Sequence, residues 1–206
     1  MPAGTFPFFD RPLVLASASP RRKFLLGLVG FEFEVVPPTV DEEEHADEDP
    51  MTHVLRLAEV KARSVAAGLK SGLVLGADTI VLLEGEILEK PADEHEAFAM
   101  LSRLSGVWHI VYTGLAVVDA ATGESAAGYE TTRVKIRKMS PEEIRAYIDT
   151  GEPMDKAGSY GIQGYGAAIV EAVDGCYFNV VGLPLVRLLR VLRNLTGQPG
   201  GKIHGG

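Results

Sequence analysis

Four short polar segments of this sequence interrupt or follow apolar stretches, and their side chains can bind anions or move protons. They are Ser17–Arg22, Gly76–Thr79, Glu89–Pro91 and Glu152–Gly164. In α/β proteins, ligands bind near strand ends and helix N-termini, which is where the flanking sequence places these segments. They are therefore the candidate site.

The segment Ser17–Arg22 (SASPRR) joins a buried strand to the start of a helix that Ser19 can cap. Arg21 and Arg22 add positive charge where the helix dipole is already positive, which is unfavourable unless an anion lies in front of the turn. Because the arginine fork suits phosphate oxygens, the segment is a candidate phosphate site. The alternative is that both arginines lie on a solvated face and pair with carboxylates.

Asp78 interrupts the otherwise apolar stretch 73–83. Burying a carboxylate is costly unless it is paired or bound to a metal, so we expect Asp78 to point into a cleft. There it could serve as a general base or a metal ligand. Gly76 and Ala77 would leave room for a ligand beside it. The alternative is an aspartate that hydrogen-bonds a nearby turn.

Two lysines stand close to these segments. Lys61 falls on or beside the apolar face of a predicted helix, and Lys90 follows a short predicted strand. Several cations in one pocket would offset the roughly four negative charges of a triphosphate. Each lysine taken alone is more simply explained as an exposed, solvated side chain.

The stretch 152–166 is polar, rich in glycine and without periodicity. Its glycines allow positive φ and close backbone approach, and long polar loops in compact domains are often functional. Asp155, Lys156 and Gln163 supply an acid, a cation and an amide. The alternative is a mobile linker, although Tyr160 and Ile162 indicate packing.

Helical and strand patterns mix along the chain. Strands are predicted at 12–17, 31–36, 73–83, 107–119, 125–139 and 168–173, with short ones before Lys90 and near Asn179, the latter after a turn at Asp174–Gly175; helices are predicted at 19–29, 49–68, 93–104, 140–151 and 183–195. Both crossover and hairpin connections occur, so the expected fold is α/β with a mixed sheet flanked by helices.

Composition excludes several classes of protein. The 206 residues carry a net charge of −8, which argues against a general nucleic-acid binder. The single cysteine, Cys176, cannot form a disulfide within the chain and suits a reducing compartment. No apolar run approaches a membrane span, and the start does not have the pattern of a secretory signal. We therefore expect a cytoplasmic protein that contacts no membrane.

Metal-binding patterns are also informative. The chain has no Walker A sequence, no HExxH and no CxxC, and its five histidines lack metal-ligand spacing. Any metal should then be a hard, oxygen-bound divalent cation, Mg²⁺ or Mn²⁺. The acidic run 41–44, which includes Glu42, offers a further ligand, although such runs are more often solvated loops.

Taken together, the segments LASASPRR, LAEVKAR, LGADTIV, ILEKP, MLSRLSG and GEPMDKAGSYGIQG resemble the Maf family of nucleotide pyrophosphatases, over about residues 12–192. The resemblance implies one domain, 11–196, with extensions at 1–10 and 197–206. Its fold would be a long, curved mixed sheet in two lobes with a cleft, similar to inosine triphosphate pyrophosphatase. It further implies metal-dependent cleavage of the α–β phosphoanhydride bond of nucleoside triphosphates and a possible homodimer.

Residue roles follow from the same resemblance. Asp78 matches the family's proton acceptor. Arg21, Thr79 and Gln163 match its substrate-specificity positions, and the other polar residues of its cleft are matched by Ser17, Ser19, Arg22, Lys61, Lys90 and Lys156. We further expect Asp155 to bind substrate, and Asp78 and Glu42 to bind the metal. The loop resembles the branch acting on dTTP and UTP, and a Gln163 amide can pair with an adjacent donor and acceptor of uracil or thymine. Ser159 departs from the alanine that is frequent in the family.

Two alternatives are open. A non-catalytic nucleotide sensor acting in cell division would bind nucleotide without turnover, but it would need no placed base such as Asp78. A purine-type house-cleaning pyrophosphatase is the second, against which Gln163 argues. The sequence leaves the physiological nucleotide open among dTTP, UTP, CTP and modified pyrimidines.

Overall fold

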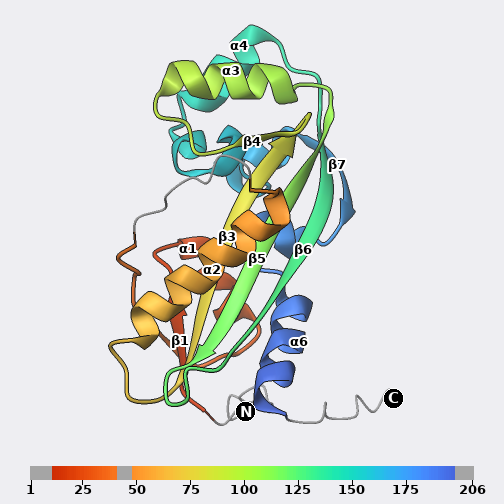
Figure 1. The fold of residues 1–206 in the computed structure, drawn as a ribbon. Helices are drawn as coiled ribbons and strands as arrows, with labels where there is room; N and C mark the ends of the chain where they lie inside the picture. The colour runs from red at the N-terminus through yellow and green to blue at the C-terminus, as the bar shows by residue number, and fades with distance from the viewer. Residues whose placement is uncertain (1–10, 41–47, 198–206) are drawn as a thin grey trace, which may run out of the picture.

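A single mixed sheet organises the protein, as the alternation of patterns predicts. The computed structural model describes residues 11–40 and 48–197, and within these ranges seven strands pair in the order β2-β1-β3-β5-β6-β7, with β4 added beside β3 (Figure 1). The strands are β1 (Leu13–Ala16), β2 (Phe33–Val35), β3 (Leu73–Leu83), β4 (Glu86–Leu88), β5 (Trp108–Asp119), β6 (Ser125–Ile136) and β7 (Val170–Gly175). The helices are α1 (Pro20–Leu28), α2 (Pro50–Ala66), α3 (Glu94–Leu104), α4 (Pro141–Ile148), α5 (Tyr177–Val181) and α6 (Leu185–Thr196).

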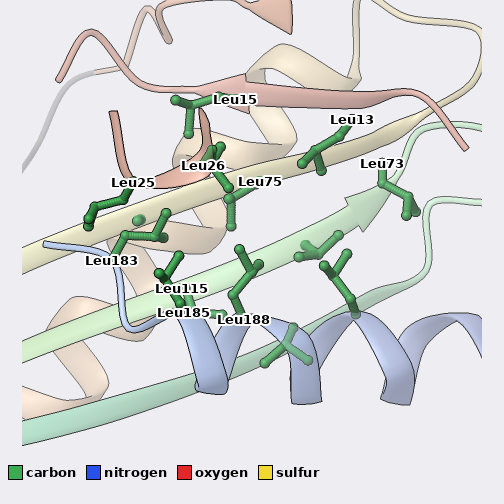
Figure 2. Close-up of a cluster of buried hydrophobic side chains, with 14 of the residues drawn as sticks. Leu13, Leu15, Leu25, Leu26, Leu73, Leu75, Leu115, Leu183, Leu185 and Leu188 are labelled. Carbon is green, nitrogen blue, oxygen red and sulfur yellow. The ribbon is translucent and has the colours of Figure 1, made fainter. Parts of the chain in front are cut away.

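Helices cover both faces of the sheet. On one face α2 packs over β1, β3 and β5, where Val14, Ala16 and Val74 meet its small apolar side chains. On the other face the alternate strand residues meet α1 and α6. Figure 2 shows this second layer, in which Leu75 and Leu115 of the strands face leucines of both helices. Alternation of side chains along each strand thus builds two cores from one sheet.

A separate apolar cluster fills the other end of the molecule. There α3 and α4 lie beyond the ends of the long strands (Figure 1), and Leu101 and Ile144 pack with Val81, Val111 and the end of β6. The strands β3 and β5 belong to both ends, so the structure has two packed lobes that share one sheet, as the fold prediction states.

The edge of β3 that faces β1 and β4 is interrupted. Strand β1 runs parallel to β3 and pairs with it as far as Gly76, whereas antiparallel β4 starts pairing at Val81. The opposite edge of β3 pairs continuously with β5. Residues 77–80 therefore lie between two pairing segments, next to the carboxyl end of a parallel strand, where α/β sheets present ligands.

Most helix starts agree with the sequence prediction because they depend on local hydrogen bonds. Ser19 and Asp49 cap α1 and α2, and Ser140 forms a full capping box with Glu143. At α3 the predicted box is only half formed. Asp93 accepts from the amide of Glu96, but the Glu96 side chain accepts from the amide of Ala92.

The prediction was wrong between 174 and 181. Strand β7 continues through the predicted turn to Gly175, and the predicted strand near Asn179 is the short helix α5. Val180 and Val181 favour a strand here, but tertiary contacts of Asn179 stabilise a helix instead. The buried Asn179 amide donates to the carbonyl of Val111 at 3.0 Å and to the hydroxyl of Thr132 at 3.0 Å.

Replacing Asn179 with alanine should lower the free energy of unfolding by about 1–3 kcal/mol, because the two hydrogen bonds of its buried amide are lost. Chemical denaturation monitored by circular dichroism would measure the change. The exposed Asn194 of α6 offers a matched control, Asn194→Ala, which should change stability little. Equal stability of the two variants would contradict a structural role for the Asn179 amide.

Candidate functional site

A cavity of about 390 Å³ opens beside the interrupted edge of β3, between the two lobes. All four polar segments contribute to its wall. The predicted site residues that line it are Ser17, Ser19, Arg21, Arg22, Lys61, Asp78, Thr79, Lys90, Asp155, Lys156 and Gln163. Glu42 lies outside the described residues. Tertiary structure thus brings together segments that are up to 146 positions apart, from Ser17 to Gln163.

Asp78 and Lys61 form a buried ion pair in this wall. The Lys61 Nζ lies 2.7 Å from Asp78 Oδ1, and both residues are only 7% exposed. Interpreting Lys61 as a solvated surface residue was therefore wrong, whereas Lys90 is exposed at the cavity rim. The ammonium group compensates the carboxylate charge and fixes its orientation, which is the condition for keeping an aspartate in an apolar strand.

The glycine beside Asp78 makes room for a helix and not for a ligand, contrary to the sequence interpretation. A Cβ at Gly76 would overlap the backbone of α2 at Ala58 and Ala62. A Cβ at Gly114, the residue that pairs with Asp78 on β5, would overlap the carbonyl of Val54 in the same helix. These two glycines let α2 approach the sheet closely, and this approach brings Lys61 to Asp78.

Arg22 connects three elements in the cavity wall. Its Nε donates to the carbonyl of Gly182 at 2.9 Å, and its two Nη atoms donate to Thr79 Oγ1 at 3.1 Å and Ser17 Oγ at 3.3 Å. Thr79 Oγ1 also lies 2.9 Å from Thr113 Oγ1. The guanidinium plane is therefore held rigidly at the cavity wall, which favours binding of a planar or tetrahedral oxyanion.

Arg21 reaches across the cavity to the Gly-rich loop. Its Nη1 lies 3.1 Å from Asp155 Oδ2, and Lys156 Nζ lies 2.6 Å from Asp155 Oδ1. Burial alone would raise the pKa of Asp155, but the Lys156 hydrogen bond and the Arg21 charge outweigh it and lower that pKa. The cations are thus kept near one another by a carboxylate, in a contact that links the two sides of the cavity.

The loop itself is more ordered than its sequence indicates. Three short 3₁₀ helices run through it, at Glu152–Asp155, Ala157–Ser159 and Gly164–Ala168. Tyr160 and Ile162 are buried, which confirms that the segment packs and is not a linker. Of its glycines, Gly158 and Gly164 adopt positive φ, as does Ser159 at φ 60°.

Tyr160 is a cavity residue that sequence reasoning did not assign. Its hydroxyl lies 2.7 Å from His109 Nε2, and both side chains are buried. Burial lowers the pKa of His109 to about 4, so the ring is neutral near pH 7. The only sequence signal was an aromatic residue within a polar loop, which indicates packing but names no partner.

Among the described residues, no three His, Cys, Asp or Glu side chains converge into a metal-binding group. None of the helices in these ranges has both the length and the apolar character needed to cross a membrane.

Comparison with known proteins adds an independent line of argument. Residues 12–195 match the family model described as Maf-like protein. A dTTP/UTP pyrophosphatase of Moorella thermoacetica is 52% identical over 180 residues, covering 87% of this chain and 93% of the relative. Those of Caldicellulosiruptor bescii and Carboxydothermus hydrogenoformans are each 49% identical, covering 89% and 88% of this chain and 94% and 97% of their own.

A solved structure, that of the Staphylococcus aureus Ham1 protein, aligns with a TM-score of 0.47 and 16% identity, covering 78% of this chain and 80% of its own. This likeness is too distant to add to the argument. The family model extends over nearly the whole chain and includes every segment that lines the cavity, and the relatives cover almost nine-tenths of the chain. The chain therefore belongs to the Maf family.

Proposed function

We propose that this protein hydrolyses dTTP and UTP to the monophosphate and pyrophosphate. The observation that carries the proposal is the Asp78–Lys61 pair, set in the wall of a cavity that also holds Arg21, Arg22 and Lys156. A carboxylate among several cations suits water attack on a polyanion. Relatives about half identical in sequence and bearing the name dTTP/UTP pyrophosphatase support the same reaction.

The triphosphate would lie against the N-terminus of α1. Pro20 has no N–H, and the amides of Arg22 and Lys23 bond to Ser19, so the donors offered to phosphate oxygens are the Arg21 amide and the Arg22 fork. Lys90 and Lys156, which also line the cavity, would offset further negative charge. This arrangement resolves the unfavourable placement of two arginines at a helix start, because the anion lies in front of them.

The reacting water would be oriented by Asp78. The carboxylate accepts a proton from the water while the water oxygen attacks the α-phosphorus. The bond from that phosphorus to the α–β bridging oxygen breaks, and pyrophosphate leaves. Because Lys61 holds the carboxylate at a fixed place, little reorganisation is needed when the water reacts.

The described residues suit a metal ion whose ligands come partly from the substrate, and they do not supply a complete set of protein ligands. Asp78 can supply one carboxylate oxygen, and Mg²⁺ is generally bound by one or two carboxylates together with phosphate oxygens and water. We propose Mg²⁺ or Mn²⁺ at this position, with Glu42 as a second ligand. Such a cation would neutralise charge that develops on the phosphate oxygens.

Gln163 and Thr79 would contribute to substrate selection. Gln163 lines the cavity from the Gly-rich loop and presents both an amide donor and a carbonyl acceptor. Uracil and thymine display an acceptor, a donor and an acceptor along one edge, so two hydrogen bonds to the amide are possible. Thr79 is instead engaged with Arg22 and Thr113, which favours an indirect role.

The proposal is tested by pyrophosphate release from purified protein with Mg²⁺, offered dTTP, UTP, CTP, GTP, 7-methyl-GTP and ITP in turn. Turnover of dTTP and UTP above the others is the expected result. Nucleotide binding without any turnover would favour the sensor, and preference for ITP would favour a purine-type pyrophosphatase. A homodimer and a cytoplasmic location stay predictions.

A further inference from the structure

The carboxylate of Glu152 bonds to one end of the segment that carries Gln163. It accepts hydrogen bonds from the amide of Tyr165 at 2.8 Å, the amide of Gly166 at 2.9 Å and the hydroxyl of Tyr147 at 2.8 Å. Burial opposes ionisation, but these donors outweigh it and lower the pKa of Glu152, so the carboxylate is charged near neutral pH. Three hydrogen bonds thus converge on the Glu152 carboxylate, and two of them come from backbone amides that lie two and three residues after Gln163.

Tyr147 bonds to the other end of the same segment. Its hydroxyl, held by Glu152, also accepts from the amide of Gly161 at 3.1 Å. The tyrosine belongs to α4 and is buried in the apolar cluster of that lobe, so it is a rigid support. The backbone is therefore fixed two residues before Gln163 and two to three residues after it.

Close packing leaves this arrangement little freedom. A Cβ at Gly164 would overlap the Glu152 carboxylate, and one at Gly166 would overlap the carbonyl of Gly161. A glycine-rich backbone is otherwise the most flexible kind, and these contacts restrict it together with the burial of Ile162 beside Gln163. A glutamine side chain has three rotatable bonds, so its amide can be placed accurately only if the backbone beneath it is fixed.

We infer that Glu152 and Tyr147 are positioning residues for nucleobase recognition, which act by holding Gln163 at the base-binding side of the cavity. The inference rests on the proposed function and extends it, because neither side chain is among the residues that line the cavity. They set selectivity through Gln163 and leave the phosphate-binding groups, Arg22 and Lys61, in place.

Glu152 and Tyr147, with their hydrogen bonds to the amides of 161, 165 and 166, form a clamp on the backbone around Gln163. Two variants weaken this clamp and keep the volume of the side chains. In Glu152→Gln one of the two oxygen acceptors becomes an NH₂ donor. Whichever way the amide is turned, this NH₂ group faces the N–H of either Tyr165 or Gly166, and that hydrogen bond is lost. In Tyr147→Phe the acceptor for the Gly161 amide is lost. Glu171→Gln and Tyr129→Phe are matched controls, since both residues are exposed on β7 and β6 outside the cavity lining.

The measurement is binding of two non-hydrolysable probes by titration calorimetry. One is uridine 5′-[α,β-imido]triphosphate, and the other is inorganic diimidotriphosphate, which lacks base and sugar. In both clamp variants the affinity for the nucleotide should fall by about tenfold to a hundredfold, because losing the two hydrogen bonds between the Gln163 amide and the base has an effect of this size. The affinity for the base-free probe should stay within about twofold of wild type, as should both affinities in the controls.

A double-mutant cycle separates positioning from general structural damage. In a Gln163→Ala background, Glu152→Gln should reduce nucleotide affinity no further, since there is no amide left to position. The inference would be overturned if the losses of nucleotide affinity in the single variants added up in the double variant. It would also be overturned if a clamp variant lost affinity for both probes equally or kept its nucleotide affinity, or if the wild type bound both probes equally. Pyrophosphate release by the wild type tests the proposed function separately, because the binding cycle requires no turnover.

Discussion

Asp78→Asn is expected to lower kcat for UTP by about 10²–10⁴, the usual effect of losing a general base. Asparagine has the same shape as aspartate and keeps one oxygen that can accept the hydrogen bond from Lys61, but it cannot take a proton from water. The variant should still fold. Its free energy of unfolding should fall by about 1–3 kcal/mol, because the buried ammonium of Lys61 loses its counter-charge. Pyrophosphate release and chemical denaturation measure the two effects.

The matched control is Asp174→Asn on β7, where the carboxylate is exposed and lies 3.5 Å from Arg133. Both its activity and its stability should stay near wild type, since exposed pairs contribute little. Near-full activity of Asp78→Asn would remove Asp78 from the role of base. Loss of binding to the nucleotide probe in proportion to the loss of turnover would instead place it in substrate binding.

Gly76→Ala is expected to damage both the fold and the reaction, although it adds only one methyl group. That methyl would overlap the α2 backbone at Ala58, and a backbone cannot move aside as a flexible side chain can. Displacing α2 should lower the free energy of unfolding by about 1–3 kcal/mol. It should also separate Lys61 from Asp78, and a shift of about 1 Å there can reduce kcat by about a hundredfold.

Gly27→Ala provides the control for this substitution. Gly27 lies in α1, and an added Cβ would meet no atom within 4 Å beyond its chain neighbours and the nearby helix backbone, so alanine should leave activity unchanged and raise stability by up to about 1 kcal/mol. If Gly76→Ala raised KM for UTP without loss of stability, the glycine would be making room for the ligand after all, as its sequence position alone indicates.

Local chemistry of the sequence determined the elements and the identity of the candidate site. The limits of β3 and the starts of α1, α2 and α4 were predicted correctly, because strand alternation and capping act over a few residues. Local chemistry also singled out the candidate residues. A carboxylate inside an apolar strand and two arginines at a helix start are each unfavourable locally, and the structure places all three side chains in the wall of one cavity.

Tertiary structure decided how those residues are held. The Asp78–Lys61 pair depends on two glycines that admit α2 to the sheet, and Gly114 lies 36 positions after Asp78. Helix α5 stands where its valines favour a strand, because Asn179 bonds to β5 and β6. The contacts of Tyr147 before Gln163 and of Glu152 after it join side chains to backbone amides of a Gly-rich loop. Such interactions carry no local signal, since their energy comes from packing and burial that exist only once the chain has folded.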